Sequence, residues 1–195
     1  MNHQSDQYYI NQVLEGRVNA FSVLVERYQS LVYTVVYRMM KNKEQAEEVA
    51  QDCFIKAYQS LNKYRGEAKF STWLYTIAYR KSLDTIKASR RIMTSELIEE
   101  INEGEIELVT DALSYLEAKE RKEIISDSIM KLSEDEAAIV TLYYFDEKSI
   151  KEIAEIVGLT ADNVKIKLYR SRKKLYSILH HQISPEISNK NGRAI

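Results

Sequence analysis

The sequence is short of the residues that build turns and cross-links. Its 195 residues include one Pro, five Gly and one Cys. So few turn-forming residues, together with long stretches of helix formers, exclude an architecture with many tight turns and predict an all-α fold. Because 45% of the residues are hydrophobic, the chain can build one large or two small apolar cores.

The chain also lacks pairs of cysteines and long apolar runs. Cys53 is the only cysteine, so the chain forms no internal disulfide and no multi-cysteine zinc site, which fits a reducing compartment. Residues 1–12 lack the pattern of a secretory signal, and the densest apolar run, LVYTVVY at 31–37, is too short to span a bilayer. We expect a cytoplasmic protein without membrane insertion, with no cofactor, no metal site and no catalytic residue.

The positive and negative charges nearly cancel but are unevenly placed along the chain. The formal net charge is −1, which by itself argues against nucleic acid as a partner. Residues 63–91, however, hold eight Lys or Arg and two acids, residues 95–123 hold three Lys or Arg and ten acids, and residues 164–180 hold six Lys or Arg and no acid. Two basic segments that flank an acidic connector indicate two separate contacts with nucleic acid.

Apolar residues at three- and four-residue spacing predict the helices. The pattern gives a short helix at 5–16, long helices at 21–39 and 44–61, and, after a loop at 62–70, a helix at 72–91 with Ser71 as its N-cap. Residues 94–118 are acidic and only weakly periodic, as in a tether. We expect two small helical domains at 5–92 and 119–182, a flexible acidic linker at 93–118 and a disordered tail at 183–195.

The second domain contains a helix-turn-helix pattern. Ser149 with Glu152 forms a capping box, as does Ser133 with Glu136 earlier in the chain. A short helix follows Ser149, Gly158 makes the turn, and the stretch LTADNVKIKLYRSRKKL at 159–175 continues as a second helix. Spacing, caps and charge agree on this interpretation.

The second helix of this motif divides into two faces. Val164, Leu168, Ser171 and Leu175 recur at helical spacing and are expected to point inward. The opposite face is suited to the major groove of duplex DNA, where Arg170 or Lys165 would pair with guanine, Asn163 with adenine, and Ile166 with a thymine methyl group. A merely solvated surface helix is the alternative, but six cations without an acid repel each other. The predicted duplex contacts are Thr160, Asp162, Asn163, Lys165, Ile166, Lys167, Tyr169, Arg170 and Lys173.

The stretch YRGEAKFSTWLYTIAYRK at 64–81 mixes aromatic rings with cations, as a surface that stacks unpaired bases and neutralises phosphates requires. Tyr75 and Tyr79 share a helix face with Leu83 and are expected to pack inside. Tyr64, Phe70 and Trp73 are the candidates for base contact. The predicted single-strand contacts are Lys63, Tyr64, Arg65, Lys69, Phe70, Ser71, Trp73, Thr76, Arg80, Lys87 and Arg91.

Three blocks in order resemble the extracytoplasmic-function group of bacterial RNA polymerase sigma factors: AEEVAQDCFIKAYQSL, NKYRGEAKFSTWLYTIAYRK and the helix-turn-helix stretch with the helix before it. The likeness spans about residues 5–180. It implies that the first domain melts the minus-ten promoter element and captures it as a single strand, and that the second reads the minus-thirty-five element as duplex. Many members carry Asn where this chain has Arg80, so the preferred minus-ten base stays open.

The resemblance also implies protein partners. In the family, the segment that matches EEVAQD here docks on the coiled coil of the largest polymerase subunit. An apolar Ile55 on an otherwise polar helix face is typical of such a contact. An anti-sigma factor is the other expected partner, although no residue identifies its surface. The predicted contacts with core polymerase are Glu48, Gln51, Asp52, Ile55 and Gln59.

Two rival functions stay open at this stage. A two-domain transcriptional regulator that binds operator DNA without polymerase explains residues 119–182 equally well, but it leaves the aromatic and basic stretch at 64–81 without a role. A carboxylate-dependent nuclease is the second rival. Only Glu48 and Asp52 share a helix face, and no histidine or third carboxylate is expected nearby.

Overall fold

The structure is a computed structural model that describes residues 4–89 and 118–191. Within these ranges every regular element is a helix and there is no strand, so the predicted all-α class is confirmed. None of the helices in the described ranges is long and apolar enough to cross a membrane. Arg91 and nearly all of the predicted linker at 93–118 lie outside the described residues.

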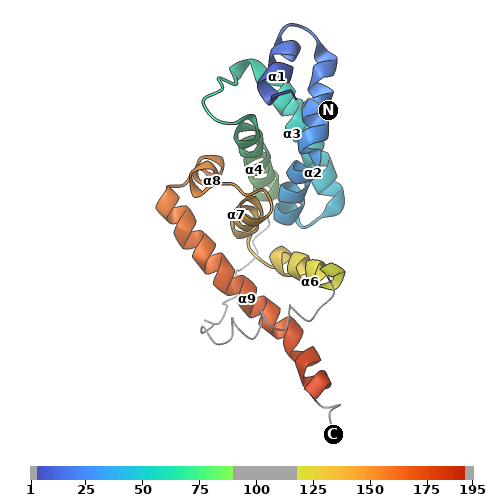
Figure 1. Cartoon of the computed structure of the whole chain (residues 1–195), viewed down its shortest axis with the longest axis vertical. Coiled ribbons are helices and arrows are strands. Elements are labelled where there is room, and N and C mark those ends of the chain that lie inside the picture. Colours follow the sequence, from blue (N-terminus) through green and yellow to red (C-terminus); the bar gives the residue numbers. More distant parts are fainter. Residues whose placement is uncertain (1–3, 90–117, 192–195) are drawn as a thin grey trace.

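The first group of helices forms a bundle at one end of the molecule (Figure 1). Asn42 caps α3 by accepting a hydrogen bond from the backbone N–H of Gln45, and Lys41 ends α2 in the left-handed conformation. The chain therefore turns sharply between the two helices, which pack against each other and against α4. The elements are α1 (Asp6–Leu14), η1 (Val18–Ala20), α2 (Phe21–Met40), α3 (Lys43–Gln59), η2 (Leu61–Lys63) and α4 (Phe70–Ser89).

The second group contains the predicted helix-turn-helix. The side chain of Ser149 accepts from the backbone N–H of Glu152, and the Glu152 carboxylate accepts from the backbone N–H of Ser149, which completes the predicted capping box. Gly158 follows with φ 71°, and Thr160 caps the next helix by accepting from the N–H of Asn163. The elements are α6 (Ala118–Met130), α7 (Glu134–Tyr144), α8 (Ile150–Val157) and α9 (Ala161–Asn191).

Two predicted boundaries differ from the structure. Helix α4 begins at Phe70, so Ser71 lies inside its first turn and is not the N-cap; the N–H of Trp73 bonds instead to the carbonyl of Lys69. Helix α9 continues to Asn191, so the predicted start of a disordered tail at 183 falls within this helix. Residues 192–195 of that tail lie outside the described residues.

The two groups of helices also pack directly against each other. Helix α2 contacts α7, and α4 contacts α8, in addition to the contacts inside each group. One continuous apolar cluster contains residues of both groups, for example Leu24, Met39 and Leu142. In α7 all residues from Ala137 to Leu142 are buried, which means that no side of this part of the helix faces solvent. The sequence predicted two domains, but not that one would cover the other.

We predict that Gly158→Ala destabilises the helix-turn-helix through the backbone alone. A Cβ added at Gly158 would meet no atom within 4 Å, but the residue holds φ 71°. A left-handed conformation costs an alanine about 1 kcal/mol relative to glycine. Urea unfolding should show this loss, and Gly158→Asn should lose less, because asparagine tolerates the conformation better. Equal losses for both variants would contradict this explanation.

Candidate nucleic-acid interface

A cluster of three aromatic rings lies where the basic loop meets the start of α4. The ring of Tyr64 lies 5.7 Å from that of Phe70 and 5.4 Å from that of Trp73, and the last two are 5.6 Å apart. The Tyr64 hydroxyl donates to the carbonyl of Ala68 at 2.7 Å, which closes the loop on itself. The cluster thereby fixes the loop against the helix.

Burial separates the rings that can meet a base from those that cannot. Phe70 is only 2% exposed, and Ser71 only 6%, so neither can contact DNA in this conformation. Phe70 forms the base of the cluster, whereas Tyr64 and Trp73 are half-buried and keep part of their surface at the solvent. Tyr75 and Tyr79 are buried, as predicted from their helix face.

The cations of this region surround the loop and follow α4. Thr76 is half-buried, and its hydroxyl donates to the carbonyl of Thr72, so it is a weaker candidate for DNA contact. Arg91 lies outside the described residues. The predicted cations that the structure leaves exposed are Lys63, Arg65, Lys69, Arg80 and Lys87.

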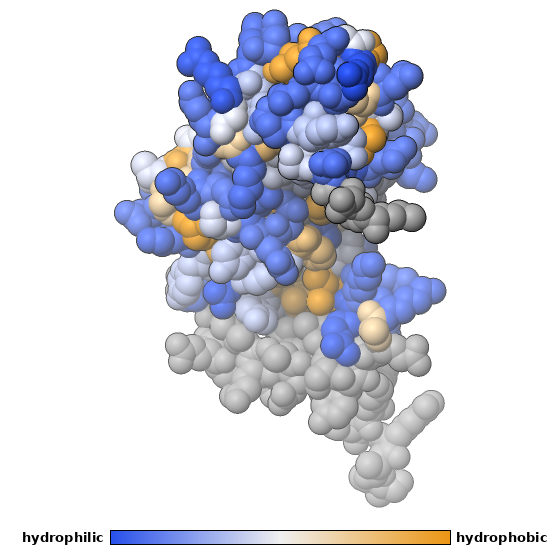
Figure 2. Space-filling view, turned by 45° about the horizontal axis from the view of Figure 1, so that its top comes forward, coloured by the Kyte–Doolittle hydropathy of each residue, from blue (hydrophilic) through white to orange (hydrophobic). Residues whose placement is uncertain are grey.

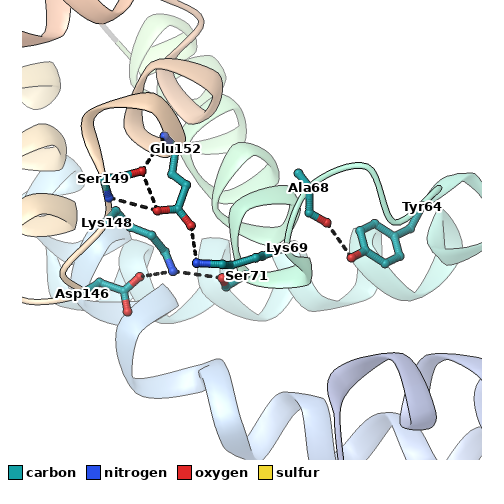
Figure 3. A network of polar contacts seen from close by, with 8 residues as sticks. All are labelled: Tyr64, Ala68, Lys69, Ser71, Asp146, Lys148, Ser149 and Glu152. Atoms are coloured by element: carbon teal, nitrogen blue, oxygen red, sulfur yellow. Dashed lines mark hydrogen bonds and ion pairs between the residues drawn. The ribbon is translucent and has the colours of Figure 1, made fainter.

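Helix α8 of the second group reaches this face (Figure 3). Nζ of Lys69 lies 2.9 Å from Oε1 of Glu152, and Nζ of Lys148 donates to the Ser71 hydroxyl at 3.0 Å. The Lys69 ammonium, together with the capping bonds from Ser149, lowers the pKa of the Glu152 carboxyl to about 2, against the opposing effect of burial. The carboxylate is therefore charged and engaged at neutral pH.

Helix α9 presents its predicted face to solvent. Val164, Leu168 and Ser171 are buried and Leu175 is half-buried, which confirms the inward stripe. Lys167 is half-buried and lies 3.3 Å from Asp135, while half-buried Lys173 lies over the ring of Tyr169 at 5.1 Å. The predicted duplex contacts that are exposed are Thr160, Asp162, Asn163, Lys165, Ile166, Tyr169 and Arg170.

A groove runs between α2 and α3, next to the predicted polymerase face. One part has a volume of about 510 Å³ and is lined by Phe21, Ile55 and Tyr58, and a neighbouring part of about 450 Å³ shares Val25 and Phe54 with it. Figure 2 shows that the visible surface of the first group of helices is mostly hydrophilic, with a few separate apolar patches. An apolar groove within a polar rim is typical of a protein contact.

The predicted polymerase-contacting residues lie mainly on the exposed side of α3. Ile55 is 54% exposed, and Asp52 is half-buried and forms an ion pair with Lys81 at 2.8 Å. The predicted contacts Glu48, Gln51, Ile55 and Gln59 are exposed. In the part of the chain that the structure describes, no three His, Cys, Asp or Glu side chains gather to hold a metal.

Several residues at the contact between the two groups were missed by the sequence analysis. Asp135, Asp146 and Lys148 form polar bonds across or beside this contact, and Arg38 of α2 donates to the Thr141 hydroxyl of α7 at 3.0 Å. Each looks like an ordinary surface charge in the sequence. Only their partners, which are distant in the chain, give them a role.

Comparison with protein families identifies both groups of helices. The family model described as Sigma-70 region 2 matches residues 24–92, and the model described as Sigma-70, region 4 matches residues 122–175. The first range covers most of α2 and all of α3 and α4, and the second covers most of α6 through the exposed face of α9. Both candidate DNA-binding faces therefore fall within recognised regions.

Similar proteins cover nearly the whole chain. The ECF RNA polymerase sigma factor SigW of Bacillus subtilis is 33% identical over 172 residues, which is 85% of this chain and 92% of the relative. The ECF RNA polymerase sigma-E factor of Escherichia coli K12 is 30% identical over 177 residues, 88% of this chain and 92% of the relative. A solved structure of the sigma factor RpoE with the anti-sigma factor NepR, from Bartonella quintana, shares the fold at TM-score 0.62 and 17% identity, covering 82% of this chain and 96% of the other.

We predict that Phe70→Ala acts on stability first. Removing a buried phenylalanine side chain costs about 3–5 kcal/mol, through the lost apolar burial and the cavity left behind. The matched control is Arg65→Ala, five residues earlier in the same loop region, where the arginine side chain is 82% exposed and the change should be nearly neutral. Chemical denaturation of the full chain measures both, and a neutral Phe70→Ala would show that the ring is not part of the core.

Proposed function

This chain belongs to the extracytoplasmic-function group of RNA polymerase sigma factors, which direct the polymerase to promoters, and we propose how its residues divide that task. The observation that carries the proposal is the exposed, acid-poor face of α9 in a region-4 helix-turn-helix, combined with a half-buried aromatic cluster beside cations in region 2. A protein that binds duplex at one site and single strand at another needs both.

Helix α9 enters the major groove of the minus-thirty-five element. Arg170 and Lys165 are exposed and carry donors for guanine O6 and N7, Asn163 has the amide that pairs with adenine, and Ile166 offers an apolar contact for a thymine methyl group. Thr160 and Asn163 lie at the N-terminal end of α9, where recognition helices commonly contact bases and phosphate. Lys167 and Lys173 add charge at the sides of this face.

The loop and the start of α4 bind the minus-ten element once it is single-stranded. Tyr64 and Trp73 supply the partly exposed rings on which an unpaired base stacks, at about 1–3 kcal/mol per base. The exposed cations named above neutralise the backbone phosphates. Phe70 and Ser71 support the surface from beneath instead of touching DNA. Arg80 occupies the place where many relatives have Asn, so it is expected to alter the preference for one base.

Core polymerase binds the exposed side of α3 and the neighbouring groove. Ile55 and Tyr58 offer apolar surface, and Glu48, Gln51 and Gln59 form a polar rim around it. Binding there fixes the first group of helices on the polymerase, so that its DNA contacts become intramolecular. This chain contributes binding and positioning to transcription initiation, and the proposal requires no catalytic residue within it.

An anti-sigma factor is a further proposed partner, because the structure with TM-score 0.62 is that of a sigma factor in complex with the anti-sigma factor NepR. Since promoters and polymerase lie in the bacterial cytoplasm, the chain is proposed to act there. The rival of a polymerase-independent regulator is not favoured. It accounts for region 4 alone, whereas the family models match both halves.

We predict that the chain with core polymerase initiates transcription from a subset of a randomised promoter library, and that core alone does not. In the same assay Arg170→Ala should relax the preference at one upstream base pair, worth about 1–3 kcal/mol. Arg172→Ala is the control. It is exposed on α9, about 200° around the helix axis from Arg170, and its charge partly opposes the burial that raises the pKa of Tyr144. No enrichment over core alone contradicts the function, and equal effects of both variants contradict the assigned face.

We also predict that Ile55→Ala weakens binding to core polymerase by at least about fivefold, the cost of truncating a residue in the middle of an interface. Ile166→Ala is the matched control, because Ile166 is a similarly exposed isoleucine, at 49%, on α9. Titration of labelled chain with core polymerase in the absence of DNA measures both. Loss of affinity in both variants alike would show that the contact is not on α3.

A further inference from the structure

Helix α1 lies outside the matched region 2, yet it packs beside the loop proposed to bind the minus-ten strand. The match to Sigma-70 region 2 begins at residue 24, whereas α1 spans Asp6–Leu14. The helix contacts α2 and η2 (Figure 1), and its residues Ile10 and Val13 are buried in the apolar cluster. Since η2 leads directly into the loop at 64–69, α1 is fixed beside the start of that loop.

The carboxylate of Asp6 is the centre of the polar contacts between α1 and α2. Its Oδ2 accepts from the Tyr28 hydroxyl at 2.5 Å, and its Oδ1 forms an ion pair with the guanidinium of Arg27. The same guanidinium donates to the carbonyl of Gln4 at 3.2 Å and lies 5.6 Å from the centre of the Tyr9 ring. The side chains of Asp6 and Arg27 are 24% and 27% exposed, so water reaches them only in part. Both oxygens of this carboxylate are therefore bonded to side chains of α2.

Tyr28 connects Asp6 to the aromatic cluster. Its ring lies 5.7 Å from that of Phe70, the buried base of the cluster, and the Phe70 ring in turn contacts those of Tyr64 and Trp73. Burial, together with the hydrogen bond to Asp6, raises the pKa of the Tyr28 hydroxyl, so this hydroxyl remains a protonated donor at neutral pH. A path of direct contacts thus runs from α1 to the two rings that are partly exposed.

The loop itself also meets α1. Gly66 holds φ 74°, and a Cβ placed on it would lie 3.8 Å from the side-chain oxygen of Gln7. The Gln7 amide donates to the side chain of Asn11, one turn later in α1, at 2.8 Å. Burial raises the pKa of the Tyr64 hydroxyl, and the charge of Asp6 adds to this rise, because the carboxylate lies near that side chain as well. The loop is therefore supported by α1 in addition to the aromatic cluster.

The position of Asp6 in its own helix gives it a simpler role too. It lies in the first turn of α1, directly after the N-cap Ser5, where a carboxylate stabilises a helix of any function. That role needs no partner outside α1. The bonds to Arg27 and Tyr28 reach another helix, and the second of these two side chains touches the cluster.

We propose that Asp6 is a positioning residue of the minus-ten face: it holds Tyr28, whose ring supports the aromatic cluster and so fixes how that cluster presents its exposed rings to an unpaired base. The rings fixed in this way are Tyr64 and Trp73. Their single-strand role rests on the proposed function, whereas their fixed position does not. A ring that is already held in place loses less freedom when a base stacks on it, and this preorganisation strengthens binding. Helix α1 is thus part of the single-strand site.

Fluorescence of the full chain tests the positioning without DNA, because Trp73 is the only tryptophan. In Asp6→Ala the emission of Trp73 should shift to longer wavelength and its quenching by acrylamide should increase, since the ring becomes more exposed to water. Asp6→Asn should keep most of the native signal, because the amide oxygen still accepts from Tyr28. Tyr28→Phe keeps the ring and removes only the hydrogen bond, and it should change the signal in the same direction as Asp6→Ala.

Glu26→Ala is the matched control. It removes one negative charge from the residue next to Arg27, but Glu26 is exposed on α2, and the variant should keep the native spectrum. Circular dichroism should show the same helical content in every variant. If Asp6→Ala loses helical content, Tyr28→Phe decides instead, because it deletes a single oxygen atom. A native Trp73 spectrum in the deciding variant, or an equal shift in Glu26→Ala, would overturn the proposal.

Binding of a single strand by the chain with core polymerase tests the role of the rings. The probe is a short labelled strand that carries the minus-ten sequence enriched in the library assay. Asp6→Ala should bind it about three- to fivefold more weakly, which is at or below the loss of one stacked base, because both rings are still present. Affinity for a duplex that carries only the upstream element should not change, since α1 packs on α2 and η2. A variant that is merely less well folded would lose both affinities alike.

The two measurements distinguish the position of the rings from their use. A shifted Trp73 spectrum together with weaker binding of the strand alone supports the proposal. A shifted spectrum with unchanged binding of the strand contradicts it, because the rings would then have no part in the minus-ten face. If the wild-type chain fails in the library assay, the proposed function is refuted, and the fluorescence of the variants still decides whether Asp6 positions the rings.

Discussion

The burial of α7 on every side is the constraint on which the rest of this structure depends. From Ala137 to Leu142 each residue is buried, although an isolated helix-turn-helix domain would leave one side of α7 open to water. Helix α2 covers that side, and α8 and α9 cover the others. Apolar surface removed from water drives this association, and the polar bonds at its edge set its orientation. The position of α8 over the first turn of α4 follows from the same packing.

The charges around this contact have two uses. In the free chain the acids of α7 and α8 hold Lys69 and Lys167; on a promoter the same cations would face phosphates. The exchange replaces an ion pair within the chain by one with a phosphate, so the binding of a third molecule can shift it. A formal net charge of −1 is consistent with this balance, because the chain carries enough acid to compete with DNA for its own cations.

Binding of core polymerase is the event that we expect to shift the cations from the acids of the chain to the phosphates of the promoter. In the proposed assignment, polymerase binds α3 and the groove beside it and so holds region 2 in place. Two weak contacts with DNA then act at a fixed spacing and add as one strong contact.

The sequence by itself determined the all-α class, the capping boxes, the turn at Gly158 and the inward stripe of α9, because these depend on residues a few positions apart. It also identified the family and predicted that the outer face of α9 and Ile55 would be exposed. Only the tertiary structure decided that Phe70 and Ser71 are buried and that Lys69, Arg38 and Lys148 bind across the two regions. Their partners are distant in the chain, and no local pattern distinguishes a lysine that meets Glu152 from one that meets water. Packing of α7 against α2 brings those partners together, and packing is a property of the assembled fold.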